Sequence, residues 1–426
     1  MANIVVATYN PLKKEGGIFP YVETFLAGLK YFGNNILHFE KKAVEKIIDN
    51  KIPKKYLDRI QNFNPDLFIL FDNQFWDISS LFDVPIIIYD IDSPVAYANI
   101  DRLNNNDRYK FLCITKEGKS VISDVIGCSD KNICYIPPFT GVVAREEKIE
   151  RNIGFCGSHW LWNNFNEVFD FIKENPSNND REIAKKVWKE YQNNPFFFPE
   201  DFYIKNKYIA EKHLKTDNLY NFSTRISGLK RARYLLAIED LGLEIRGLHW
   251  NNPNCQILKA FPELLLSYSA EKIINTNTTE KFYNSSKIGF CVNHIQANSG
   301  FSWRVCDILA SNACLVAERT KDLLSFGFNV PTFDSIAGAR EECIKILTEE
   351  NMRFDIVEAT HEIIDKNHRF KNILPIIENF IGINLHSNGR GTIETVFTDY
   401  FNARQFNLKR RIYNRLTRYL YKLLIE

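Results

Sequence analysis

Short, nearly continuous apolar segments recur along this chain, separated by stretches with helical periodicity. The segments PDLFILF (65–71), VPIIIYD (84–90) and FLCIT (111–115) are bounded by polar residues or proline. Apolar residues at nearly every position of a strand indicate that both of its faces are buried, which is typical of parallel sheets covered by helices on both sides. The alternation of strand and helix therefore predicts a doubly wound α/β sheet.

This series of strands and helices occurs twice. The first series starts at NIVVAT (3–8) and ends near ICYIPPFTGVVAREEKIE (133–150), where a pair of prolines precedes a charged stretch. The second series restarts at once with NIGFCGS. Further strands are expected at 243–248, 272–276, 288–293, 313–318 and 330–334. Because 426 residues exceed one ordinary core, we expect a first Rossmann-like domain at 1–148 and a second at 149–390, with a helical insertion at about 160–235.

Residues 391–426 are expected to form C-terminal helices, of which the last, RQFNLKRRIYNRLTRYLYKLLIE (404–426), is amphipathic and basic. Its Phe, Tyr and Leu side chains fall on one side, and its lysines and arginines fall largely elsewhere. Such a helix is typical of segments that lie on an anionic membrane surface. The alternative is that its apolar stripe packs on the first domain. We expect the membrane surface for the part after Lys409.

The composition excludes several classes of protein. A net charge of +2 does not indicate a nucleic-acid partner, which a strong basic excess would. Nine cysteines occur without a C-x-x-C pair and eight histidines are dispersed, so neither a disulfide framework nor a metal site is expected. The N-terminus MANIVVATYN has no signal-peptide pattern, and no apolar stretch approaches the length of a membrane span. We therefore expect a cytoplasmic protein, peripheral on the inner face of the cell membrane through its tail.

The stretch HIQANSGFSWRVCDILASNACLVAE joins a polar loop to a helix and then to a strand. Small and polar residues precede the helix and a cation falls in its first turn: Ser299, Gly300, Ser302 and Arg304. Free N–H groups at a helix start, close backbone approach and a fixed positive charge are the usual means of holding a phosphate. Asp307, one turn further on, can accept hydrogen bonds from a ribose. The alternative is plain helix capping by a serine, with Asp307 stabilised by the helix dipole.

Open parallel sheets bind ligands at the carboxyl ends of their strands, and this rule selects further residues. In the second domain it selects Gly157, Ser158, His159, His249 and His294. A histidine in such a loop contacts a ligand or is held by backbone contacts, and both interpretations stay open. In the first domain the same rule selects Gly16, Gly17, Asp72, Asp90 and Asp92.

The C-terminal half of the chain also carries the sequence pattern of a known family. The segments FYNSSKIGFCVN, SGFSWRVCDILASNACLVAE and FGFNVPTFDS resemble the CgeB-like group of GT-B glycosyltransferases, with its glycosyl transferase group 1-like motif. The matching residues are Tyr283, Asn284, Ser302, Arg304, Asp307, Ala310 and Ser311. Asn312 stands where glycine is usual. IIIYDIDSP and GGIFPYVETFLAGLKYFGNNI are similar to first-domain elements of the superfamily, so the resemblance touches most of the chain except the insertion and the tail.

The resemblance implies two Rossmann-like domains that face each other across a cleft, the GT-B architecture. It implies a nucleotide-sugar donor in the second domain, held by the residues selected there, and an acceptor beside Gly16, Gly17 and Asp72 of the first. Asp92, with Asp90 as the lesser candidate, becomes the base that takes a proton from an acceptor hydroxyl. The alternative for Asp92 is a turn before the proline that follows. Neither a metal ion nor another cofactor is expected.

The expected function is transfer of a sugar from a nucleotide sugar to a hydroxyl of a glycan or lipid-linked acceptor, in bacterial surface polysaccharide or lipopolysaccharide synthesis. Many retaining members of the superfamily carry Glu-x7-Glu. Asp307 stands for the second acid, but Ser299 occupies the first position, so the sequence does not specify a retaining outcome. The alternatives are a Kdo transferase that uses CMP-Kdo through an aspartate such as Asp240, a nucleotide-sugar epimerase, and a non-catalytic sugar-binding scaffold.

Overall fold

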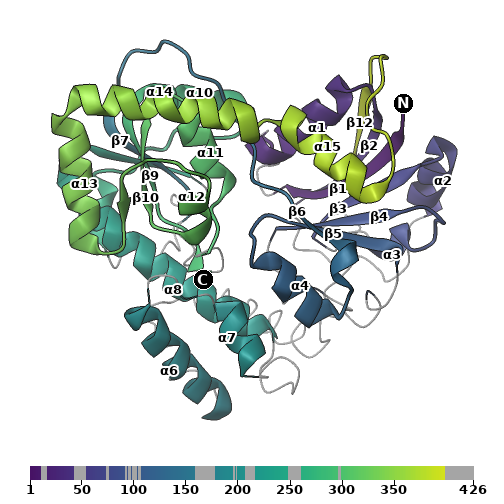
Figure 1. Cartoon of the computed structure of the whole chain (residues 1–426), viewed down its shortest axis with the longest axis horizontal. Helices are drawn as coiled ribbons and strands as arrows, with labels where there is room; N and C mark the ends of the chain where they lie inside the picture. Colours follow the sequence, from purple (N-terminus) through teal and green to yellow (C-terminus); the bar gives the residue numbers. More distant parts are fainter. Residues whose placement is uncertain are drawn as a thin grey trace, which may run out of the picture.

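The structure, a computed structural model of the chain, contains two parallel β-sheets, each covered by helices on both faces (Figure 1). This arrangement confirms the predicted doubly wound α/β class. The structure describes residues 1–10, 17–42, 54–72, 76–91, 94, 97, 103, 107–158, 178–194, 197, 199–206, 216–247, 261–295 and 299–398. No helix in this part of the chain is both long and apolar enough to cross a membrane.

The first sheet has seven parallel strands in the order β12-β2-β1-β3-β4-β5-β6. They are β1 (Asn3–Asn10), β2 (Asn35–Lys42), β3 (Leu67–Phe71), β4 (Ile86–Asp90), β5 (Tyr109–Cys113), β6 (Ile133–Tyr135) and β12 (Thr392–Thr398). Helices on this sheet are α1 (Pro20–Tyr31), α2 (Lys54–Phe63), α3 (Trp76–Ser79), α4 (Gly118–Ile126) and α15 (Phe370–Ile381), with a short 3₁₀ helix η4 (Asp130–Asn132).

Successive residues of these strands supply two separate cores. Val5, Phe68 and Ile88 lie in the core that includes residues of α2 and α4. Ile4 and Ile69 lie in the opposite core, with residues of α1 and α15. Because both faces of the sheet are buried, all five residues of β3 are apolar and buried. This is the physical basis of the continuous apolar segments in the sequence.

The second sheet has five parallel strands in the order β11-β10-β9-β7-β8. They are β7 (Arg151–Cys156), β8 (Leu243–Arg246), β9 (Ser286–Cys291), β10 (Cys314–Glu318) and β11 (Thr332–Phe333). The helices are α6 (Asn178–Asn193), α7 (Pro199–Lys205), α8 (Thr216–Leu236), α10 (Thr276–Asn284), α11 (Trp303–Leu309), α12 (Lys321–Ser325), α13 (Ile336–Thr348) and α14 (Glu350–Asn367). Two 3₁₀ helices, η5 (Glu239–Leu241) and η6 (Pro262–Leu265), complete this part.

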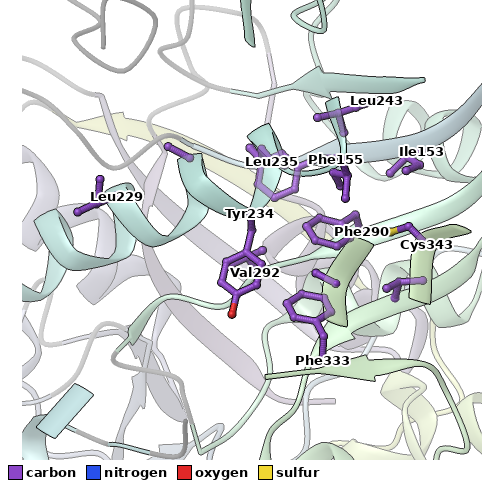
Figure 2. Close-up of a cluster of buried hydrophobic side chains, with 14 of the residues drawn as sticks. Ile153, Phe155, Leu229, Tyr234, Leu235, Leu243, Phe290, Val292, Phe333 and Cys343 are labelled. Atoms are coloured by element: carbon purple, nitrogen blue, oxygen red, sulfur yellow. The ribbon is translucent and has the colours of Figure 1, made fainter. Parts of the chain in front are cut away.

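Aromatic rings fill the core between the second sheet and helices α8 and α13 (Figure 2). The rings of Phe290 and Phe333 stack with their centres 5.2 Å apart, and Tyr234 of α8 lies 5.0 Å from Phe333. Leu235 and Cys343 bring the two helices into the same cluster. Burying each of these large side chains stabilises the fold by roughly 1.5–3 kcal/mol. The second half of α8 is thus part of the domain core.

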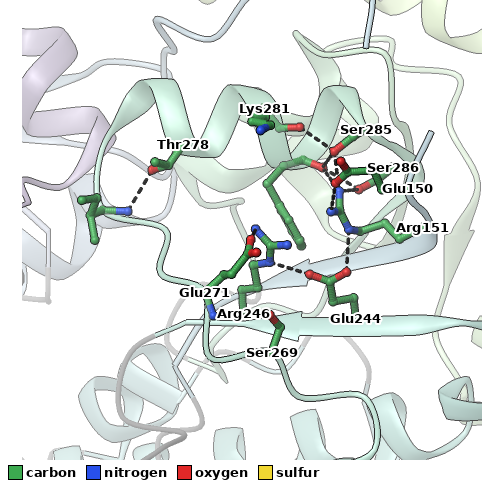
Figure 3. A network of polar contacts seen from close by, with 12 residues as sticks. Glu150, Arg151, Glu244, Arg246, Ser269, Glu271, Thr278, Lys281, Ser285 and Ser286 are labelled. Carbon is green, nitrogen blue, oxygen red and sulfur yellow. Dashed lines mark hydrogen bonds and ion pairs between the residues drawn. The ribbon is translucent and has the colours of Figure 1, made fainter. Parts of the chain in front are cut away.

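A charged network fixes α10 to the edge of this sheet (Figure 3). Glu244 of β8 accepts from Arg151 Nε at 2.9 Å and from Arg246 Nε at 2.5 Å. Arg246 also pairs with Glu271 at 2.7 Å. Both guanidinium groups lie over the ring of Phe282 on α10, at 4.8 and 4.9 Å from its centre. The network gives buried arginine stems an aromatic surface and their charges a carboxylate partner.

The connection between the sheets, residues 136–150, is fixed to the second domain. The side chain of Asn284 donates to the carbonyl of Val143 at 2.9 Å and accepts from the backbone N–H of Arg145 at 3.2 Å. Asn312 donates to the carbonyl of Arg145 at 2.6 Å. Two residues singled out by the family pattern therefore hold this linker. The expected domain boundary at 148 lies within it.

The chain crosses back to the first sheet before the boundary expected at 390. Phe370, the first residue of α15, packs on α1, with its ring centre 5.5 Å from that of Phe25. The helix expected at 391–426 is wrong for Thr392–Thr398, which form β12 parallel to β2. The run TIETVFT is rich in β-branched residues, and the edge of β2 offers it unpaired backbone groups. The tail at 404–426 lies outside the described residues.

Two further expectations change at their boundaries. The insertion expected at about 160–235 contains α6, α7 and most of α8, and its first part lies outside the described residues. The strand expected at 272–276 is instead a loop followed by the start of α10. The side chain of Asn275 accepts from the N–H of Thr278 at 2.9 Å, a capping box that starts the helix there.

Candidate functional site

The carboxyl ends of β7 and β8, two neighbouring strands, bring two glycines together. Gly247 follows β8 with a φ of +153°, and a Cβ atom at this position would lie only 2.3 Å from the carbonyl oxygen of Gly157. Only glycine tolerates both this φ and this approach. The backbones directly after the two strands therefore meet at these two glycines.

Arg304 of α11 extends to this place. Its guanidinium carbon lies 5.8 Å from the ring centre of Phe155, and a Cβ atom on Gly157 would lie 2.9 Å from one of its nitrogens. Two residues selected from distant parts of the sequence, Gly157 and Arg304, are thus in direct contact.

A second arginine, Arg231 of α8, lies on the same ring at 5.5 Å. It is fully buried, donates to the carbonyl of Val292 at 3.0 Å and donates to the carbonyl of Ser158. Burial, and then the charge of Arg304, lower the pKa of Arg231 to about 9. Two guanidinium groups so close together repel each other, and a bound anion would relieve that repulsion.

Sequence reasoning missed Arg231, although a signal was present. Ser227 and Leu235, four residues before and after Arg231, are both buried, so this cation falls on the core face of its helix. A cation on the apolar side of a helix is rare unless it has a fixed partner. That observation would have selected it.

His294 lies at the end of β9 in the same region and is half-buried. Burial lowers its pKa well below the ordinary value, and the nearby charges of Arg231 and Lys230 lower it further. The imidazole is therefore neutral at pH 7 and suited to hydrogen bonding with an uncharged ligand group. The other two histidines selected from the sequence, His159 and His249, lie outside the described residues.

The serines ahead of α11 do not cap it. Ser302 is the N-cap residue, but its hydroxyl makes no capping hydrogen bond. Within the described residues, the buried hydroxyl oxygens of Ser299 and Ser302 have no hydrogen-bond partner. The capping interpretation is therefore wrong for Ser302. Since α11 has only seven residues, the positive charge of this site comes mainly from Arg231 and Arg304.

Asp307 is buried in α11 and bonded to the linker between the domains. The hydroxyl of Thr140 donates to its Oδ1 at 2.6 Å. Burial raises the pKa of Asp307 to about 7, although the hydrogen bond from Thr140 and the charges of Arg304 and Arg369 oppose this. Among the described residues, no group donates to the other carboxyl oxygen. The carboxylate proposed for a ribose is thus already tied to the linker by one oxygen.

A buried ion pair stabilises the elements that carry the site. Lys230, next to Arg231 on α8, pairs with Glu318 at the end of β10 at 2.7 Å. The other oxygen of Glu318 accepts from the backbone N–H of Asn293 at 3.2 Å. The pair therefore joins α8, β10 and the loop after β9, and it fixes the helix that carries Arg231. Sequence reasoning did not select either residue.

In the first domain, the selected residues also lie at carboxyl strand ends. Asp90 ends β4 and accepts from the hydroxyl of Tyr97 at 2.5 Å. Asp72 follows β3 with a φ of 56° and accepts from the backbone N–H of Ile91 at 2.9 Å, so it shapes the loop that leads to Asp92. Asp92 itself lies outside the described residues.

Gly17 serves a contact between domains. A Cβ atom on it would lie 2.4 Å from the carbonyl oxygen of Ile274, and the next residue, Ile18, donates its N–H to that oxygen at 2.8 Å. Gly17 and Ile18 therefore pack against the second domain. Gly16 lies outside the described residues.

The structure also shows where side chains that could bind a metal ion lie, and where Asp240 lies. Within the described ranges, no group of three or more His, Cys, Asp or Glu side chains is placed to hold a metal ion. Asp240 lies before β8, at the end of the sheet opposite the arginines, and pairs with Arg340 at 2.8 Å on the surface. Its position does not suit a nucleophile in this site.

Residues 229–379, which include both arginines, Asp307 and Glu318, match the model of the family described as glycosyl transferase-like. No curated protein sequence matches the chain.

Solved structures with the same fold are distant in sequence. A glycosyltransferase from Rickettsia africae is 10% identical, with a TM-score of 0.52 over 89% of this chain and 99% of that one. An α-glucosyltransferase in complex with UDP and DNA is 11% identical, with a TM-score of 0.53 and the same coverage. HepE of Anabaena, in complex with UDP-glucose, is 12% identical, with a TM-score of 0.50 and again the same coverage.

Proposed function

We propose that this chain, a glycosyltransferase with the GT-B fold, transfers a sugar from a nucleotide-sugar donor to a hydroxyl of a glycan or lipid-linked acceptor. In this proposal the donor is held at Arg231 and Arg304. The observation that carries the proposal is the pair of guanidinium groups on the ring of Phe155. This pair of guanidinium groups lies at the carboxyl ends of the strands of the second sheet, where open parallel sheets bind their ligands.

The pair suits a pyrophosphate better than a single carboxylate. Arginines bind phosphate oxygens through parallel hydrogen bonds and keep their charge when buried. Arg231 is held by its carbonyl partners, and Arg304 is half-buried. Neutral His294 beside them would contact the uncharged sugar or ribose, and Asp307 would accept from a ribose hydroxyl.

Catalysis in this proposal consists mainly of positioning and leaving-group stabilisation. When the glycosidic bond breaks, negative charge develops on the departing phosphate, next to the two guanidinium groups. They supply the positive charge that a metal ion supplies in other transferases, so we propose a reaction without a metal ion. Asp92, in the loop shaped by Asp72, would accept the proton of the attacking hydroxyl.

We further propose that the acceptor lies at the inner face of a membrane. The support is the basic amphipathic segment 404–426, whose cations would bind anionic lipid and bring a lipid-linked acceptor near the first domain. A chain with this tail fits bacterial surface polysaccharide or lipopolysaccharide synthesis.

A thermal-shift panel of UDP-, GDP-, dTDP- and CMP-sugars tests the function. A donor that binds the native state raises the melting temperature by mass action. At a hundredfold excess over its Kd, the donor increases the free energy of unfolding by about 2.7 kcal/mol. We expect one nucleotide class to give a clear shift, with slow release of free nucleotide over time. The absence of a shift with every donor contradicts the proposal. A shift without any turnover in the presence of acceptor extracts favours the sugar-binding scaffold instead.

A further inference from the structure

Helix α12 and the loop before α11 are bonded to each other and to the first domain at one place. Asp322, the second residue of α12, is buried and donates its backbone N–H to the carbonyl of Ser299 at 2.9 Å. Its carboxyl oxygen Oδ2 accepts from the backbone N–H of Lys116 at 3.1 Å. Lys116 follows β5 of the first sheet, so this one side chain spans the boundary between the domains.

Other contacts surround this one. The ammonium group of Lys116 donates to the hydroxyl of Ser325 at 2.6 Å and lies 5.3 Å from the ring centre of Phe326. Lys321 pairs with Glu117 at 3.4 Å. Surface ion pairs of this kind contribute little by themselves. The buried carboxylate of Asp322 is different, because a lost partner would leave it desolvated and unpaired.

The two domains approach each other closely at Gly300. A Cβ atom on Gly300 would lie 2.4 Å from the methyl carbon of Thr115 in the first domain and 3.4 Å from Oδ2 of Asp322. The φ of Gly300 is not in the left-handed region, so an alanine there meets no backbone strain. The glycine is needed at this position because the two domains meet there.

We infer that Asp322 is a positioning residue that couples the association of the two domains to the geometry of the loop at Ser299 and Gly300, four to five residues before Arg304. When the first domain docks, Lys116 binds the carboxylate of Asp322, and the N–H of Asp322 holds the carbonyl of Ser299. Loop 299–302 and the first turn of α11 then take one geometry, which aims Arg304 at the strand ends. The kinetic consequence of this coupling rests on the proposed function, whereas the domain contact does not.

Three variants test the inference. Asp322→Ala removes the acceptor. Gly300→Ala inserts a methyl group against Thr115 and should hold the domains apart. The double variant Gly300→Ala with Thr115→Ser removes the opposing methyl but keeps the hydroxyl that caps α4 through the N–H of Gly118, at 3.0 Å. Asp334→Asn, an exposed partner of Arg319 in the second domain, is the matched control.

Small-angle scattering and steady-state kinetics supply the readouts. We expect Gly300→Ala and Asp322→Ala to have a larger radius of gyration than the wild type, and the double variant to return toward it. With the donor found in the panel, KM should rise by about two- to tenfold for Asp322→Ala, the factor that one lost hydrogen bond is worth. The double variant should recover KM relative to Gly300→Ala, a rescue that a merely destabilised protein would not show.

Wild-type compactness in Gly300→Ala and Asp322→Ala, or a double variant as open as Gly300→Ala, would overturn the inference. If the wild type turns over no nucleotide sugar, the proposed function fails, but the scattering comparison still decides whether Asp322 and Gly300 hold the domains together. A change in KM without any change in scattering would place Asp322 in the binding site and not at the domain contact.

Discussion

At the scale of single residues, the candidate site contains buried charged side chains, and burying a charge costs free energy. Arg231 and Arg304 lie on one aromatic ring, and Asp307 is buried with a raised pKa. Burial of a charge without full compensation lowers the stability of the folded protein, and in the proposed site a ligand that brings negative charge or hydroxyl donors would relieve this cost. Side chains held this way are characteristic of functional sites, where stability is lost in exchange for binding.

The raised pKa of Asp307 predicts a pH profile of stability. Its folded pKa of about 7 exceeds that of an unfolded aspartate, so the unfolded chain releases this proton first as pH rises from about 4 to about 7. The contribution of Asp307 to stability is therefore fully present below pH 4 and is lost as pH rises toward 7. Asparagine does not ionise, so the melting temperature of Asp307→Asn should rise relative to wild type as the pH increases from about 4 to about 7. Asp334→Asn, exposed on the same domain, should follow the wild type. Parallel profiles for Asp307→Asn and wild type would contradict the buried, protonated carboxyl.

Asp92 is the residue expected to carry proton transfer. Asp92→Asn should lower turnover by a factor on the order of 10²–10⁴, with donor binding nearly intact, because only the acceptor step needs the base. Asp72→Asn is the comparison, since that side chain holds the N–H of Ile91 and shapes the same loop. Turnover of Asp92→Asn near the wild-type level would leave Asp92 as a turn residue before the following proline.

At the scale of elements, the periodicity of the sequence predicted buried strands well and exposed ones poorly. β3 and β4 are apolar at each position except the last residue of β4, and their existence follows directly from that pattern. β12 was not predicted because it lies at an edge and exposes much of its length. The segment at 272–276 is rich in residues that favour strands, but the capping box of Asn275 and Thr278 stabilises the start of a helix there.

The site was predictable only in part, for a related reason. Gly157, Ser158, His294 and Arg304 follow from the rule that ligands bind at strand ends, and the structure brings them together. Arg231 and Glu318 were not predicted. The apolar side of α8 could have indicated that Arg231 is buried, whereas the burial of Glu318 follows only from its packing beside Lys230.

The C-terminal tail is the element whose role a truncation can test. The segment after Lys409 should bind vesicles that contain anionic lipid, with roughly 1 kcal/mol from each basic residue near the surface and screening by salt. Co-sedimentation of the full chain should exceed that of a chain ending before Lys409, and only with anionic lipid. Equal sedimentation of the two chains, or a truncated chain that does not fold, would make the tail a structural element that packs on the protein.

At the scale of the whole molecule, the two sheets present their carboxyl ends to each other. Gly17 and Ile18 meet Ile274, and the residues after β5 meet Gly300 and Asp322. Tyr21 of α1 also stacks on Trp303 at the start of α11, with ring centres 4.3 Å apart. In the proposed reaction, donor contacts from one domain and acceptor contacts from the other would thereby be brought to one place, as transfer between two substrates requires.

The central claim is that Arg304 and Arg231 hold the phosphates of the donor. The direct measurement is calorimetric titration of the wild type and Arg304→Ala with the nucleotide selected by the thermal-shift panel and with its parent nucleoside. Arg340→Ala, at the opposite end of the second sheet, is the matched control. We predict that Arg304→Ala weakens binding of the nucleotide by about 1.5–3 kcal/mol, the range for a charge-assisted hydrogen bond, and leaves the nucleoside and the control unaffected. Unchanged nucleotide affinity in a folded Arg304→Ala protein, or an equal loss for the nucleoside, would contradict a phosphate site at these arginines.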